Sequence, residues 1–198
     1  MPLSDDSEHL RERFVAKVDA WRGAFLDVRR DRVALPDGSE ADREFIVHPG
    51  AVMVIPLLGD DRVVVERQWR YPMARAMLEF PAGKLDPGEP VLDCAVRELA
   101  EETGYRATEW ARAGILHNAI SYSTEGIEVW FARRLVELVD RHREDVEELA
   151  GVELTFAGLE AARRGDITDA KTLVGLLWLA NWRSGRWPLE WRSVAAAT

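Results

Sequence analysis

The sequence predicts an α/β protein with a small antiparallel β unit at its N-terminus. In the first part of the chain, Pro, Asp, Gly and Ser occupy residues 36–39 between two alternating runs, which is typical of a hairpin turn. Two apolar runs, residues 51–58 and 62–69, flank Gly59 and form a second strand pair. Residues 91–103 follow with helical periodicity. Strands on both sides of a helix are typical of the α/β class.

The N-terminal part of the chain is expected to form its own unit. Residues 21–35 alternate between apolar and polar side chains, and residues 41–48 can return beside them as the second arm of a hairpin. We therefore divide the chain into residues 1–48, an N-terminal helix and antiparallel β unit, and residues 49–198, the main domain.

The helix over residues 91–103 has clear start and stop signals. Pro90 suits a first turn, Glu89 suits the positive N-terminal end, and Gly104 suits the position just past the C-terminus. Its apolar stripe consists of Val91, Leu92, Ala95, Val96 and Leu99. Cys94 lies within this helix and is expected to be a small core residue.

Later elements follow from the same patterns. We expect strands over residues 109–116, 126–135 and 151–156, and a charged loop over residues 137–148. Two helices close the chain, and the second contains an apolar run at residues 173–180.

Composition excludes some classes of function. The 198 residues carry a net charge of -9, which argues against nucleic acid as the main partner. A single cysteine and the polar residues 1–13 favour a cytoplasmic protein, without a disulfide and without a secretory signal. The run at residues 173–180 is far shorter than the ~20 residues of a membrane span.

Three carboxylates of the predicted helix point to a metal. Glu98, Glu101 and Glu102 have spacing i, i+3 and i+4, so they project from one face. Glu98 and Glu102 border the apolar stripe, and Arg97 can orient Glu101. Gathered hard oxygen ligands suit Mg²⁺, Mn²⁺ or Ca²⁺ better than zinc. The alternative is a solvated acidic helix face paired with Arg97, which an acidic helix usually is.

The spacing of the whole segment decides between these two interpretations. It resembles the Nudix box, Gly-x5-Glu-x7-Arg-Glu-U-x-Glu-Glu-x-Gly-U, where U is usually aliphatic. The matching positions are Gly83, Glu89, Arg97, Glu98, Leu99, Glu101, Glu102, Gly104 and, as the one loose fit, Tyr105. Seven fixed positions at about one chance in sixteen each make a random match in this chain of the order of one in a million.

The resemblance implies a Nudix hydrolase, an α/β/α sandwich with a mixed central sheet. Residues 63–72, 78–86 and 165–172 are similar to segments of ADP-ribose pyrophosphatases and related nucleotide-sugar hydrolases. The implied reaction is Mg²⁺-dependent hydrolysis of ADP-ribose to AMP and ribose 5-phosphate. Residues 117–125 lack the Ser-Pro-Gly stretch of many such enzymes, so GDP-mannose or ADP-glucose is an alternative substrate. A ligand sensor without catalysis is a third hypothesis, which the intact box disfavours.

The resemblance also implies roles for residues outside the helix. The backbone carbonyl of Ala82 would be a metal ligand beside Glu98, Glu101 and Glu102. A further catalytic carboxylate would come from the later loop, with Glu147 as first choice and Glu144 as second. The alternative for that loop is a solvated charge run.

Substrate contacts and a partner subunit are implied in the same way. Arg70 and Glu79 resemble residues that contact phosphates and the terminal ribose, and their alternative is a surface salt bridge. In a domain-swapped homodimer, Arg43 and Phe25 would touch the adenine in the partner's site. The alternative for Phe25 is core packing.

Overall fold

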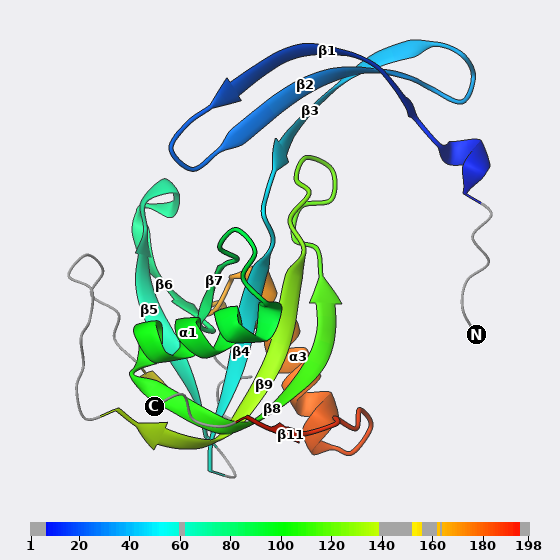
Figure 1. The fold of residues 1–198 in the computed structure, drawn as a ribbon. Coiled ribbons are helices and arrows are strands. Elements are labelled where there is room, and N and C mark those ends of the chain that lie inside the picture. The colour runs from blue at the N-terminus through cyan, green and yellow to red at the C-terminus, as the bar shows by residue number, and fades with distance from the viewer. Residues whose placement is uncertain (1–6, 60–61, 139–151, 156–161, 163, 195–198) are drawn as a thin grey trace. The chain divides into compact units, whose positions relative to one another are not determined.

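The computed structural model describes residues 7–59, 62–138, 152–155, 162 and 164–194 (Figure 1). The chain forms two compact units, which are Met1–His48 with Ala119–Glu125, and Pro49–Asn118 with Gly126–Thr198. Within the described residues, no helix is both long enough and apolar enough to cross a membrane.

The N-terminal unit is a three-stranded antiparallel sheet in the order β1-β2-β3. A single 3-10 turn, Glu8–Leu10, precedes these strands. The strands are β1 (Arg13–Arg22), β2 (Asp27–Ala34) and β3 (Glu40–Val47). The expected antiparallel unit is therefore confirmed. In the described residues, the helix expected near the N-terminus is limited to the 3-10 turn.

One strand prediction in this unit was wrong. Residues 21–35 do not form one strand, because the chain turns between β1 and β2, where the Gly23 amide donates to the Leu26 carbonyl at 2.8 Å. The turn contains Ala24, Phe25 and Leu26, and such residues give a weak turn signal. The turn over residues 36–39 is confirmed, since Leu35 N donates to Ser39 O at 2.8 Å.

A segment distant in sequence completes the unit. The Ile46 amide donates to the Tyr122 carbonyl at 2.8 Å, and the Thr124 amide donates to the Ile46 carbonyl at 3.0 Å. The Thr124 hydroxyl also accepts from the His48 amide at 2.9 Å. Ala119–Glu125, which contains most of the divergent stretch over residues 117–125, therefore belongs structurally to the N-terminal unit.

The main unit is built on a mixed sheet in the order β10-β5-β4-β9-β8-β11, with β6 on β5 and β7 on β4. Strands β4 and β9 run parallel, whereas β5 and β8 pair antiparallel with them. The elements are β4 (Ala51–Leu58), β5 (Arg62–Arg70), the 3-10 turn η2 (Tyr71–Met73), β6 (Arg75–Glu79), β7 (Ala82–Lys84), α1 (Val91–Thr103), β8 (Tyr105–Leu116), β9 (Ile127–Glu137), β10 (Val152–Thr155), α3 (Ala170–Arg183) and β11 (Arg192–Ser193). The strands predicted for this unit and the helix over residues 91–103 are confirmed, with residues 152–155 described of the strand expected over 151–156. Most of the loop expected over residues 137–148 lies outside the described residues.

Helices cover both faces of this sheet, which confirms the α/β sandwich (Figure 1). On one face, Cys94 and Leu99 of α1 pack with Val52, Val54 and other buried residues of the sheet. On the other face, Leu176 and other residues of α3 pack in a second cluster around β4 and β9. Alternate residues of β4 serve opposite clusters because successive strand side chains point to opposite faces. Cys94 is fully buried, as expected for a core residue.

Substitution Leu99→Ala tests the α1 layer. Leu99 is fully buried, so we expect the free energy of unfolding to fall by about 2–5 kcal/mol. The matched control is Leu177→Ala on α3, where the side chain is 59% exposed and the expected loss is below about 1 kcal/mol. Equilibrium urea unfolding followed by tryptophan fluorescence measures both, and equal losses would contradict the packing of α1 against the sheet.

Candidate active site

Helix α1 presents its carboxylates at different depths. The helix begins after Pro90 and ends at Gly104, which has φ 72° and whose amide donates to the Ala100 carbonyl at 3.0 Å. Glu98 is turned toward the sheet and is 8% exposed. Glu102 is half-buried and Glu101 is exposed. The prediction that Glu98 and Glu102 border the buried stripe is confirmed.

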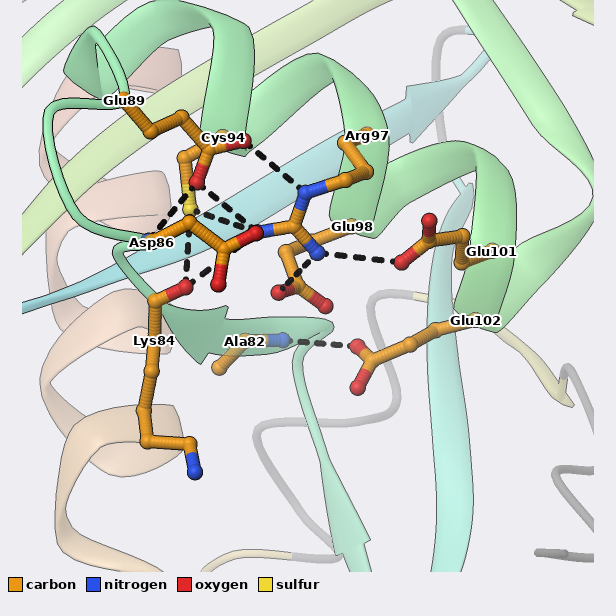
Figure 2. Close-up of polar contacts among 9 residues, drawn as sticks. All are labelled: Ala82, Lys84, Asp86, Glu89, Cys94, Arg97, Glu98, Glu101 and Glu102. Atoms are coloured by element: carbon orange, nitrogen blue, oxygen red, sulfur yellow. Dashed lines mark hydrogen bonds and ion pairs between the residues drawn. The ribbon is translucent and has the colours of Figure 1, made fainter.

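Arg97 joins the acidic residues into one network (Figure 2). Its Nε and Nη2 donate to the two carboxylate oxygens of Glu89, each at 2.9 Å. Its Nη1 donates to Oε1 of Glu98 at 2.7 Å and to Oε2 of Glu101 at 3.0 Å. Nη2 also donates to the Lys84 carbonyl at 3.2 Å. Arg97 therefore orients Glu101, as expected. It also links α1 to strand β7 through the Lys84 carbonyl and to the turn before the helix through Glu89.

The carboxylates of this network have different proton affinities. Bonds from Arg97 lower the pKa of Glu89 to about 2, helped by the Asp86 amide. Burial raises the pKa of Glu98 above its ordinary value, although Arg97 opposes the shift. Glu89 is therefore an anion that holds Arg97, whereas burial works against the ionised form of Glu98.

Gly83 makes room for the Glu98 carboxylate. A Cβ built on Gly83 would overlap with the carboxylate atoms of Glu98. Any side chain at this position would therefore displace either strand β7 or Glu98. The glycine that opens the motif is required for close approach, a reason independent of backbone dihedral angles.

Glu102 lies against the strand before the helix. The Ala82 amide donates to Oε2 of Glu102 at 2.8 Å (Figure 2). Burial, together with the charges of Glu66 and Glu98, raises the pKa of Glu102 to about 10. The amide contact brings Ala82 into the site, while the metal-binding role of its carbonyl stays a prediction.

Glu66 is a residue of this site that the sequence reasoning missed. It lies on β5, is fully buried, and neither carboxylate oxygen accepts a hydrogen bond from a donor group in the described residues. Burial raises its pKa to about 7, and its carboxyl group lies close enough to that of Glu102 to share a proton. The available signal was a glutamate directly after Val63, Val64 and Val65, in a strand expected to be buried.

The predicted pair of Arg70 and Glu79 forms a second network. Nε and Nη2 of Arg70 donate to the two oxygens of Glu79, each at 2.7 Å. Lys171 of α3 also donates to Glu79, and to Asp169 at 3.1 Å. Glu79 is 2% exposed, so this is not the surface salt bridge that was the alternative.

The partners of Glu79 control its charge. Burial alone would raise the pKa of Glu79, but the bonds from Arg70 and Lys171 outweigh it and lower the pKa to about 2. Lys171 was missed by the sequence reasoning, because a lysine in the first turn of a helix ordinarily lies in solvent.

The structure places the remaining candidates as follows. Arg43 on β3 donates to Glu12, with Nε 3.0 Å from Oε2. Phe25 is 57% exposed, so core packing does not explain it, and its ring meets His48 edge-on at 6.2 Å. Glu144 and Glu147 lie outside the described residues.

The site suits a hard divalent cation by its chemistry. Within the described part of the chain, no three acidic, histidine or cysteine side chains already converge on one point. Arg97 contacts Oε1 of Glu98, and the Ala82 amide contacts Oε2 of Glu102. Each of these carboxylates thus has a second oxygen engaged by neither contact, and oxygen donors of this kind fit Mg²⁺ or Mn²⁺.

Comparison with known proteins identifies related sequences. The sequence profile of the NUDIX domain matches residues 47–174. An ADP-ribose pyrophosphatase of Bacillus subtilis is 33% identical over 172 residues, which cover 86% of this chain and 93% of that protein. An ADP-ribose pyrophosphatase of Mycobacterium tuberculosis is 34% identical over 78% of this chain and 76% of that protein.

Two further relatives carry different descriptions. A methanol dehydrogenase activator of Bacillus methanolicus is 31% identical over 85% of this chain and 92% of that protein. The crystal structure of an ADP compounds hydrolase superposes with a TM-score of 0.73 and 25% identity, covering 89% of this chain and 94% of that chain.

Substitution Glu79→Gln tests the second network. At neutral pH it leaves Arg70 and Lys171 without their shared carboxylate, so we expect a loss of about 3 kcal/mol or more in the free energy of unfolding. Because the folded pKa of about 2 lies below the ordinary 4.5, the unfolded chain binds more protons between these values. The stability that Glu79 contributes is therefore present above about pH 4.5 and lost as pH falls toward 2.

Urea unfolding of both proteins from pH 7 down to pH 3 measures this difference. The gap between the native protein and Glu79→Gln should narrow as pH falls. The control is Glu8→Gln, which removes an exposed ion pair with Arg11 and should leave stability unchanged. A gap that stays constant with pH would mean that Glu79 has the same pKa in the folded and the unfolded protein, which would contradict its stabilisation by Arg70 and Lys171.

Proposed function

The chain belongs to the Nudix hydrolase family, and from this premise we propose that it hydrolyses the pyrophosphate bond of ADP-ribose to AMP and ribose 5-phosphate. The observation that carries the proposal is the set of carboxylates on α1, which Arg97 orders beside Gly83 and Ala82. Two relatives are ADP-ribose pyrophosphatases, and the alignment with this chain covers at least three quarters of each of them. Their names support the choice of substrate.

A divalent cation, Mg²⁺ or Mn²⁺, would be held by Glu98, Glu101 and Glu102 with the carbonyl of Ala82. When bound, it would neutralise charge at the pyrophosphate and lower the pKa of the attacking water. Arg97 holds Glu98 and Glu101 through one oxygen each, so their orientation does not depend on the ligand. Preorganised ligands of this kind need little rearrangement in the reaction.

A general base would remove the remaining proton from the attacking water. We place this role on Glu147, with Glu144 as the second choice, because the resemblance to ADP-ribose pyrophosphatases implies a catalytic carboxylate in the charged segment over residues 137–148. Substituting each with Gln separates the two, since only the base should change the pH dependence of kcat.

Arg70 is suited to contact the substrate phosphates. Its Nε and Nη2 are fixed by Glu79, and the side chain is still 39% exposed, so Nη1 remains for an anion. A guanidinium held in place by a buried carboxylate loses little side-chain entropy when a phosphate binds. Glu79 would then act on the substrate phosphates through Arg70. Its direct contact would be with the terminal ribose.

We also propose a domain-swapped homodimer in which Arg43 and Phe25 reach the adenine in the partner's site. Strand β1 is exposed along its whole length, and its exposed apolar residues include Phe14, Val15, Val18 and Trp21. Several exposed apolar residues on one edge strand are typical of an interface between proteins.

A substrate panel tests the reaction. Phosphate released after treatment with a phosphatase should be highest for ADP-ribose among ADP-ribose, ADP-glucose, GDP-mannose, NADH and diadenosine polyphosphates. A chelator should abolish the signal and added Mg²⁺ should restore it. A hexose nucleotide in first place would shift the assignment to that sugar and to the stretch over residues 117–125. No hydrolysis of any of them would favour a ligand sensor.

Two variants of α1 accompany the panel, one that tests the metal site and one that serves as its control. Glu98→Gln should lower kcat/KM about a hundredfold or more, while the far-ultraviolet circular dichroism stays unchanged. Asp93→Asn removes an equal charge from an exposed position of the same helix and should keep full activity. Unchanged turnover in Glu98→Gln would contradict the metal assignment.

The dimer is tested by light scattering at micromolar concentration. We expect about twice the chain mass of 22.4 kDa. Phe14→Glu, at a position that is 66% exposed, should convert the dimer to a monomer because a charge would be buried at the interface. Met73→Glu, at an equally apolar exposed position outside the N-terminal unit, should not. A native protein that is monomeric would contradict the dimer.

A further inference from the structure

Glu66 is a buried carboxylate that the Nudix box does not include. It lies on β5, where Glu79 of β6 is its direct cross-strand partner. The two preceding residues, Val64 and Val65, have buried apolar side chains, and Glu66 is fully buried with them. A strand position of this kind is ordinarily apolar, because an unpaired charge in the interior is costly.

The nearby cations do not neutralise Glu66. Arg70 and Lys171 are the cations that act on it, and both donate hydrogen bonds to Glu79. Lys171 is further shared with Asp169. Glu79 therefore has two positive partners, whereas Glu66 accepts no hydrogen bond from any donor group in the described residues.

The neighbour of Glu66 is another carboxylate. Its carboxyl group lies close enough to that of Glu102 to share a proton, and the backbone amide of Ala82 is the donor on the other side of Glu102. Two carboxylates in contact repel each other unless a proton or a cation lies between them. A pair of hard oxygen donors in this arrangement suits a divalent cation.

We propose that Glu66 is a further ligand of a divalent cation, which it holds together with Glu102 on the sheet side of α1. The proposal rests on the metal dependence of the proposed function, and it adds a ligand from strand β5 to those of the box. The cation takes the place of the missing donor at Glu66 and removes the repulsion between the two carboxylates. Strand β5 and helix α1 are thereby joined through the metal.

The test measures metal binding without any nucleotide. Native protein is titrated with Mn²⁺ and free Mn²⁺ is followed by electron paramagnetic resonance, beside Glu66→Gln, Glu66→Asp and the control Asp93→Asn. We expect Glu66→Gln to weaken Mn²⁺ binding about tenfold or more. Glu66→Asp keeps a carboxylate on a shorter side chain, so its Mn²⁺ affinity should lie between those of the native protein and Glu66→Gln. Asp93→Asn should match the native protein.

Thermal unfolding provides a second readout. Saturating Mg²⁺ should raise the Tm of the native protein, because a ligand that binds only the folded state stabilises it. The rise should be smaller in Glu66→Gln. This variant should fold, since the new amide can donate to Glu102, and circular dichroism checks this. Should it fail to fold, Glu66→Asp decides the question by the same two measurements.

The outcomes separate the inference from the proposed function. If Glu66→Gln binds Mn²⁺ as tightly as the native protein and gains as much Tm from Mg²⁺, Glu66 is not a ligand, and a shared proton explains the pair. The proposed hydrolysis then stands, provided that the native protein binds metal. If the native protein binds no divalent cation at all, both the inference and the metal dependence are overturned.

Discussion

The bonds from Arg97 are the interaction on which the site depends. One guanidinium joins Glu89 before the helix, Glu98 and Glu101 on the helix, and the carbonyl of Lys84 on β7. Without it, three carboxylates would repel each other beside a strand end. Because the arginine is planar and has several donors, it can hold all of these groups in fixed directions, which a lysine cannot do.

Three glutamates of the main unit differ in proton affinity according to the charged groups around them. Glu79 is buried with two cations, and its pKa falls to about 2. Glu66, which is buried, and Glu102, which is half-buried, have no cation of their own, and their pKa values rise to about 7 and about 10. Burial costs each carboxylate its hydration, and only a partner of opposite charge restores the ionised form. The distribution of cations therefore separates a structural ion pair from a group suited to a ligand.

Much of the fold could be predicted from local patterns. Strands β4 and β5 and helix α1 begin and end where the apolar runs, the glycines and Pro90 indicated. The break between β1 and β2 could not, because its turn contains the apolar residues Ala24, Phe25 and Leu26, which give a weak turn signal. The pairing of Ile46 with Tyr122 could not either, since it joins residues far apart in the chain whose hydrogen bonds involve only backbone groups.

The sequence by itself determined the helix, the spacing of Glu98, Glu101 and Glu102, and the family, because these depend on a helical repeat and on fixed positions within one segment. Only the tertiary structure decided which charged groups surround each carboxylate and therefore whether its ionised form is stabilised. Arg97 reaches back to Glu89 and Lys84, Lys171 reaches Glu79 from α3, and Glu66 meets Glu102 without a cation. The physical reason is that a charge is stabilised by its neighbours in space, and those neighbours come from strands and helices that the chain order does not bring together.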